Sequence, residues 1–177
     1  MIGKLETVPA LSRPDLLAEP VVRALQAQRS DDVLVAEIDP ELADTAAFCA
    51  AYLVPLEISA NCVVVAGKRE GSQRVAACIV LATTRADVNN VVRKRLNVRK
   101  ASFLPMEDAV EATGMEYGGI TPLGLPADWP ILVDATVVEL PYAIVGSGVR
   151  RSKIAIPGKA LAALPNADVV EGLGRRV

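Results

Sequence analysis

Apolar residues recur along the chain in two patterns, one with helical spacing and one in short continuous runs. Residues 14–25 carry apolar side chains three or four positions apart, and Pro14 is typical of a first helical turn. We expect Pro20 to kink or split this helix. Similar patterns predict helices at residues 39–52, 87–96, 105–113 and 159–164. Residues 1–11 have no sustained period and are expected to form a loosely attached arm.

The short apolar runs predict strands between these helices. They fall at residues 33–38, 56–66, 75–82, 131–135 and 153–156. The polar residues 67–71 between two of the runs predict a β-hairpin with a loop longer than two residues. Strands and helices alternate without an internal repeat or a shift in composition. We therefore expect residues 1–177 to form a single α+β domain, with a mixed sheet and helices packed outside it.

The composition agrees with this class. The chain has 177 residues, of which 51% are hydrophobic, and this is enough to build a core. Its longest uncharged apolar run, residues 46–56, is too short to span a bilayer, and the N-terminus lacks a basic segment followed by an apolar one. We expect a soluble cytoplasmic protein with no membrane partner.

The residue types that are missing restrict the chemistry. The chain has no histidine, which excludes Ser-His-Asp and Cys-His catalysis and every histidine-dependent metal site. Cys49, Cys62 and Cys78 have no C-x-x-C spacing and lie in apolar surroundings. We expect them to be reduced core residues, and we expect neither a metal site nor a cofactor.

Charge is distributed unevenly along the chain. The net charge of −2 gives the whole protein no attraction for polyanions, and we expect no DNA partner. Basic residues nevertheless gather between residues 85 and 100, and Arg93, Lys94 and Arg95 would face solvent on the predicted helix. These three side chains are candidates for contacts with RNA phosphates. The alternative is an ordinary solvated helix face.

Residues 113–124 form the most distinctive stretch, a loop with four glycines and a proline between a predicted helix and a strand. Gly118 and Gly119 allow positive φ angles or a close approach to a ligand, and Pro122 fixes the exit direction of the loop. Main-chain amides of such a loop can face a substrate. A plain tight connection is the alternative.

A second small-residue turn, residues 146–148, comes before a basic segment. An apolar strand that carries Asp134 lies between the two turns. In this order, the three segments resemble the YbaK/ProX-like aminoacyl-tRNA editing domain, whose members carry a TG…GGxxPxG loop, an apolar strand with Asp, and a small-residue turn before an Arg-containing segment. The resemblance extends from about Leu42 to Leu173, nearly the whole chain.

The resemblance implies a strongly curved, barrel-like sheet with its site between the two turns. It also implies a lysine, the residue most closely tied to deacylation, at a position that Asn61 occupies here. An asparagine amide is still a hydrogen-bond donor, and we expect it to point into the pocket rather than the core. Lys68 lies seven residues later and does not match; we expect it to be a solvated turn residue.

Roles follow for the individual residues. Catalytic roles are expected for Asn61, Gly118, Gly119, Thr121 and Asp134. Substrate-binding roles are expected for Pro122, Gly146, Ser147, Gly148, Arg150 and Lys153. The amides of the two turns would form a polar cradle for the ester, and Arg150 or Lys153 could supply the missing cation. Asp134 could instead cap a neighbouring loop, and Ser147, which has no base to activate it, fits a turn residue better than a nucleophile.

The function implied by the resemblance is trans-editing, the hydrolysis of mischarged tRNA that carries a small amino acid such as Cys, Ala or Ser. The expected partners are a tRNA acceptor end and an aminoacyl-tRNA synthetase. The replacement of the lysine leaves a second hypothesis open. It is a non-catalytic module that keeps the pocket and binds a tRNA end, a nucleotide or a synthetase.

Overall fold

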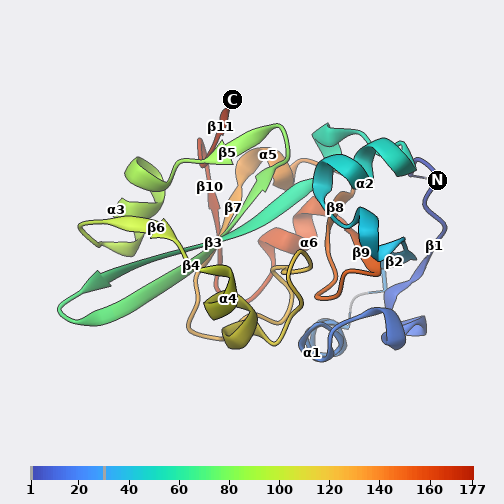
Figure 1. Ribbon diagram of the computed structural model, residues 1–177, viewed down its shortest axis with the longest axis horizontal. Helices are drawn as coiled ribbons and strands as arrows, with labels where there is room; N and C mark the ends of the chain where they lie inside the picture. The colour runs from blue at the N-terminus through green and yellow to red at the C-terminus, as the bar shows by residue number, and fades with distance from the viewer. Residues whose placement is uncertain (1, 30) are drawn as a thin grey trace.

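The computed structural model describes residues 2–29 and 31–177, in which eleven strands form three sheets with helices packed around them (Figure 1). This confirms the predicted α+β class. No helix in these two ranges is long and apolar enough to cross a membrane.

The first sheet has four antiparallel strands in the order β1-β2-β9-β8. They are β1 (Thr7–Pro9), β2 (Leu34–Glu37), β9 (Ser152–Ile156) and β8 (Ala143–Gly146). Residues 7–9 belong to the expected arm, yet they pair with β2 and so attach the N-terminal segment to the sheet. All five residues of β9 are buried, which makes this strand the centre of the sheet.

The second sheet has five strands in the order β10-β7-β4-β3-β6. They are β10 (Ala167–Val170), β7 (Ile131–Asp134), β4 (Ser72–Leu81), β3 (Ala60–Arg69) and β6 (Ala101–Phe103). Strand β7 runs parallel to β4 and β10, whereas the other neighbours are antiparallel, so the predicted mixed sheet is confirmed. A third sheet pairs β5 (Thr84–Ala86) with β11 (Gly174–Arg176).

The β3–β4 hairpin is longer than the sequence predicts, and it projects from the body of the molecule (Figure 1). Its turn consists of Glu70 and Gly71 alone, with φ angles of 51° and 78°. Two residues with positive φ are typical of the hairpin turn that matches the twist of the strands. The prediction of a longer loop was therefore wrong, and Lys68 lies on a strand rather than in a turn.

The two larger sheets meet at one point, where Ser59 forms a parallel bridge with Ile144 of β8. Strand β3 begins at the next residue, so the bridge brings β3 and β8 side by side. The sheet is not closed into a barrel, and the barrel-like part of the prediction is not confirmed. The seam between β3 and β8 is the part of the fold that positions the candidate site.

The helices are short, and several follow 3-10 or π turns. They are α1 (Glu19–Gln28), α2 (Thr45–Tyr52), α3 (Arg93–Leu96), α4 (Met106–Thr113), α5 (Ala135–Val138) and α6 (Gly158–Ala162). The predicted helix at residues 14–25 is split into a 3-10 turn (Pro14–Leu16) and α1, with Pro20 in the first turn of α1. Each proline lacks a backbone N–H, so each is accommodated at a helix start. Gly114 ends α4 with a φ of 69°, as predicted.

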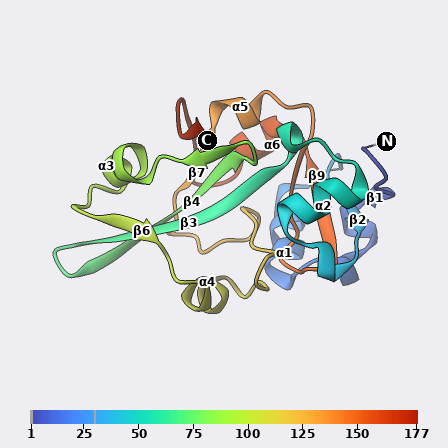
Figure 2. The same cartoon turned by 45° about the horizontal axis from the view of Figure 1, so that its top comes forward.

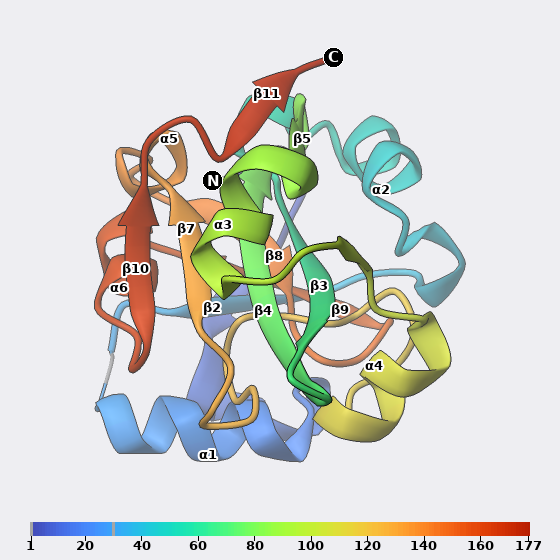
Figure 3. The ribbon, with the colours of Figure 1, turned by 90° about the vertical axis from the view of Figure 1, so that its left-hand side faces the viewer.

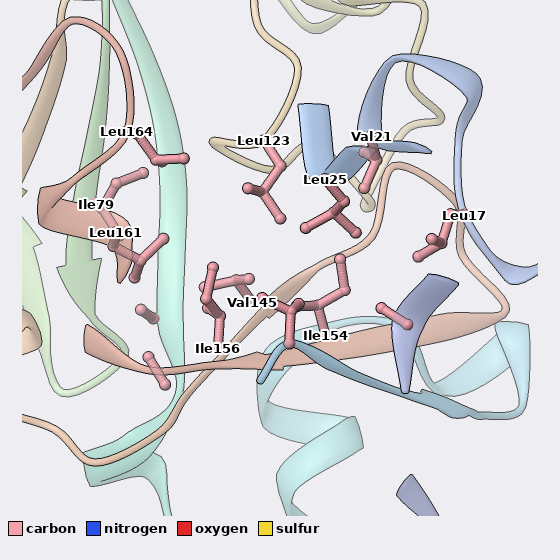
Figure 4. Close-up of a cluster of buried hydrophobic side chains, with 14 of the residues drawn as sticks. Leu17, Val21, Leu25, Ile79, Leu123, Val145, Ile154, Ile156, Leu161 and Leu164 are labelled. Atoms are coloured by element: carbon pink, nitrogen blue, oxygen red, sulfur yellow. The ribbon is translucent and has the colours of Figure 1, made fainter. Parts of the chain in front are cut away.

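The main core lies between the four-stranded sheet and the segments that cover it. Figure 4 shows Leu17, Val21 and Leu25 directed toward Ile154 and Ile156. Val21, Leu25 and both isoleucines are fully buried. Burial of one such side chain contributes about 1.5–3 kcal/mol to stability. The N-terminal segment is therefore an integral part of this core.

Candidate functional site

A cavity of about 330 Å³ lies at the seam between the two larger sheets. Strand β3 and the segment before it form one wall, and β8 with part of β9 forms another. Helix α2, the segment from β6 to α4 and the glycine loop at 113–124 complete it. Figure 2 shows α2 and α4 on either side of β3, where they flank this region. Most of the lining is apolar, and Asp44 and Lys153 are its charged residues.

Asn61 lies on β3 in the lining of the cavity, half-buried. Thr45, at the start of α2, donates a hydrogen bond of 2.7 Å from Oγ1 to Oδ1 of Asn61. Because Oδ1 is occupied by this bond, the Nδ2 amide is the group that Asn61 can offer to a ligand. The asparagine therefore lies in the pocket, as expected.

Lys153, on β9, also lines the cavity, although its side chain is only 8% exposed. Its Nζ donates to the carbonyl oxygen of Ala43 at 2.8 Å and lies 5.2 Å from the centroid of the Phe48 ring. Burial lowers the pKa of this ammonium, Cys49 and Asp44 partly offset the shift, and Arg150 adds to it. One of three donors is satisfied by Ala43, so two remain for a ligand.

The two small-residue turns lie side by side, as the sequence predicts. Gly148 donates from its amide to the carbonyl oxygen of Gly119 at 2.7 Å, and the amide of Glu116 donates to the carbonyl oxygen of Gly148 at 2.8 Å. A Cβ on Gly146 would lie 2.6 Å from the carbonyl oxygen of Gly119. Glycine is thus required for the close approach of the two backbones.

This packing changes the expected amide cradle. The amide of Gly119 donates to the carbonyl oxygen of Glu116 at 2.9 Å, and the amide of Gly148 is used as described above. Neither amide is available for a substrate. Gly118 and Ile120 line the cavity, and in the part of the chain that the structure describes their amides have no acceptor. They are the loop donors that remain for a ligand.

Arg150 connects the glycine loop to a distant turn near the cavity. Its guanidinium donates to the carbonyl oxygens of Tyr117 and Pro40, both at 3.1 Å, and its own amide donates to Glu116 Oε1 at 2.7 Å. The guanidinium also lies 5.9 Å from the centroid of the Tyr117 ring. Arg150 is not among the residues that line the cavity, so its contacts fit a clamp on the loop.

Several expected site residues lie outside the cavity lining. Ser147 is fully buried, and its Oγ contacts Ser152 Oγ at 2.6 Å. Thr121 and Pro122 are also buried away from the lining, and Thr121 Oγ1 has no partner among the described residues. Asp134 accepts hydrogen bonds at Oδ1 from the amide and hydroxyl of Thr136 at 2.8 and 2.7 Å. These bonds cap α5, the alternative role that the sequence left open for Asp134.

The cysteines do not add a nucleophile to the site. Cys62 lines the cavity, and burial raises the pKa of its thiol far above the ordinary value. Burial also raises the pKa of Cys78 to about 12. A thiol of this kind stays protonated and unreactive near neutral pH. Among the described residues, no group of three potential ligands could hold a metal ion.

The predicted RNA-binding residues lie on or beside α3, which is separate from the cavity (Figure 3). Arg93 donates to the carbonyl oxygen of Asn89 at 2.7 Å, Arg95 pairs with Asp168, and Lys94 is exposed. Two of the three cations are thus already engaged within the protein.

Sequence reasoning missed four residues of the lining. They are Asp44, Thr45, Phe48 and Phe103. The first three belong to a helix that was predicted but had no motif of its own, and Phe103 lies at the end of a three-residue strand. The alignment of α2 against β3 is a tertiary contact, for which the local pattern carries no signal.

Comparisons with known proteins agree with this geometry. Residues 39–164 match the family profile of the aminoacyl-tRNA editing domain. A candidate trans-editing enzyme for prolyl-tRNA synthetase has the same fold, with a TM-score of 0.73 and 21% identity over 87% of this chain and 94% of that one. A hypothetical protein of solved structure gives a TM-score of 0.77 and 18% identity, over 89% of this chain and all of the other. The chain belongs to the aminoacyl-tRNA editing domain family.

Proposed function

We propose that the protein is a trans-editing deacylase that hydrolyses mischarged aminoacyl-tRNA carrying a small amino acid. The observation that carries this proposal is the position of Lys153. Its buried ammonium lines the same cavity as Asn61, so a cation is present although the family lysine is replaced. The charge reaches the cavity from β9 rather than from β3.

The reaction is the attack of water on the ester carbonyl. A tetrahedral intermediate forms, its C–O bond to the ribose breaks, and the ribose oxygen takes a proton, which yields the free amino acid and tRNA. Since the ester is already activated, the protein has to supply donors for the oxyanion and a position for the water. We assign the donors to Lys153 Nζ and Asn61 Nδ2, assisted by the amides of Gly118 and Ile120.

The proposed preference for a small amino acid rests on the size and charge of the cavity. Its volume of about 330 Å³ is at the lower end for ligand sites. Asp44 makes no hydrogen bond to a described residue and lies at the start of α2. Its carboxylate is suited to receive the α-ammonium group of an aminoacyl ester.

The second candidate is a non-catalytic module that binds a tRNA end or a synthetase. The observation that favours it is Asn61 itself, because a neutral donor is roughly half as strong as a charged one. In either case the partner is a tRNA acceptor end, with a synthetase as a second partner, and the compartment is the cytoplasm, where charged tRNA is used.

One experiment distinguishes the two candidates. The full chain is incubated with a panel of labelled tRNAs mischarged with Ala, Ser or Cys, together with correctly charged controls, and release of the amino acid is followed. A deacylase accelerates release from at least one mischarged tRNA, and a Lys153→Met variant loses that activity. Binding without release by the wild-type chain would overturn the catalytic proposal and support the module.

A further inference from the structure

Phe103 is an exposed aromatic residue at a junction. Its side chain is 62% exposed, although it ends a strand that is hydrogen-bonded to β3. It lines the candidate site and also two further clefts that open on either side. An exposed phenylalanine where three hollows meet has an accessible face and no partner in the fold that explains it.

The first of the two clefts, here called the basic cleft, has a volume of about 830 Å³. Its cations are Lys68, Arg99 and Lys100, and no acidic residue lines it in the part of the chain that the structure describes. None of the three cations forms an ion pair with a described residue. The basic cleft shares Phe103 and Leu104 with the candidate site, so the two are continuous.

The backbone holds the basic cleft open in a defined way. A Cβ on Gly67 would lie 2.5 Å from the carbonyl oxygen of Lys100. Glycine at this position therefore lets the segment with Arg99 and Lys100 pack directly on β3, beside Lys68. In this way residues distant in sequence form one positively charged wall.

The second cleft is less suited to a polyanion. It contains Arg85, Arg175 and Arg176, but Asp87 also lines it and pairs with Arg175 at 2.6 Å. On α3, Arg95 is likewise paired with Asp168. The basic cleft is thus the one whose positive charge is uncompensated.

We propose that Phe103 stacks on the terminal base of a bound RNA 3′ end, and that the basic cleft carries the phosphates of the preceding nucleotides. An aromatic face beside a cationic groove is how proteins hold single-stranded nucleic acid without reading its sequence. The continuity with the candidate site would then place the ribose ester next to Lys153 and Asn61. This inference rests on the proposed function, since it names the path by which the same substrate enters.

The test uses the full chain and an uncharged RNA hairpin that ends in single-stranded CCA, compared with the same hairpin without its terminal adenosine. Affinity is measured by fluorescence anisotropy. The wild-type chain should prefer the complete end, and Phe103→Ala should abolish that preference, with a loss of roughly 5- to 150-fold, the range for one stacked base. Phe103→Trp should retain it. Because Phe103 is exposed, the alanine variant is expected to fold, which thermal unfolding verifies.

The basic cleft is tested by the salt dependence of the same binding. Replacing Lys68, Arg99 and Lys100 together by Gln should flatten the slope of log affinity against log salt by about 2, at roughly 0.7 per lost contact with a single strand. The matched variant replaces Arg93, Lys94 and Arg95 by Gln and removes the same charge from α3. A flatter slope in the α3 variant alone, or in both variants equally, would overturn the assignment.

Failure of this inference can be told apart from failure of the proposed function. If mischarged tRNA is deacylated but Phe103→Ala still prefers the complete end, only the path is wrong. If the hairpin binds as expected but no ester is hydrolysed, the path holds and the catalytic proposal fails.

Discussion

The hydroxyl of Thr45 is hydrogen-bonded to Oδ1 of Asn61, and this bond determines which group the asparagine presents to the cavity. If Nδ2 is a donor in the reaction, Asn61→Asp should keep the bond to Thr45 but lower kcat about 10²- to 10³-fold, the cost of removing one oxyanion donor. Steady-state kinetics on the mischarged tRNA that the wild-type enzyme prefers gives the value. Thr45→Ser, which retains the hydroxyl, serves as the control. An aspartate variant with unchanged kcat would exclude this role for Asn61.

Lys153 should matter for activity more than for stability. Lys153→Met removes a buried cation while keeping an unbranched side chain, so we expect deacylation to fall by about 10²-fold or more. Stability should be unchanged or higher, because a buried charge carries a desolvation cost. Urea unfolding and kcat/KM together check this. A variant that loses activity only in proportion to a loss of folded protein would contradict it.

The dependence on pH follows from the same side chain. Burial lowers the pKa of Lys153, while Asp44 and Cys49 favour its charged form and Arg150 disfavours it. If the ammonium is the active form, kcat should decline as the pH is raised through this lowered pKa, below the pH at which an ordinary lysine loses its proton. Lys153→Arg should lack the decline, since a guanidinium stays charged. The rates are corrected for uncatalysed ester hydrolysis, and an increase with pH would indicate a neutral amine acting as a base.

Asp134 should affect stability rather than catalysis. Its Oδ1 caps α5 through Thr136, and loss of such a cap costs about 0.5–2 kcal/mol. Asp134→Ala should therefore unfold at lower urea concentration, with kcat for the remaining folded protein within about twofold of wild type. A selective loss of kcat in a stable variant would return this residue to the reaction.

Gly148 and Gly71 form a matched pair for the packing of the two turns, since their φ angles are 88° and 78°. A Cβ on Gly148 would lie 2.3 Å from Cβ of Ala18, whereas one on Gly71 would have nothing within 4 Å. Gly71→Ala should cost about 1–2 kcal/mol from backbone strain. Gly148→Ala should cost about 1–3 kcal/mol more from overpacking. Equal free energies of unfolding would show that the backbones can separate without penalty.

Much of the fold could be predicted from the sequence because local patterns govern it. Gly114 and the two small-residue turns were placed correctly, since each depends on a backbone conformation that glycine favours. The helix boundary near Pro20 was anticipated for the same kind of local reason. Patterns of this type carry enough information to place the turns that bound the cavity.

The site itself was harder to predict. Lys153 follows two arginines and looks like part of a surface cluster, and only the pairing of β9 with β2 and β8 shows that its strand is buried. Asp134 looks catalytic in the sequence because a carboxylate that ends an apolar strand can either cap a helix or face a substrate. The contribution of α2 depends on tertiary packing alone.

The bridge between Ser59 and Ile144 has a consequence for how selectivity can change. The cavity has walls from two separately hydrogen-bonded sheets, so its width depends on the angle and distance at which those sheets dock. Val54 packs in the same buried cluster as Ile144 but does not line the cavity. A change of volume at Val54 would move one wall against the other. Acceptance of a larger or smaller amino acid can thus be altered by a residue that never meets the substrate.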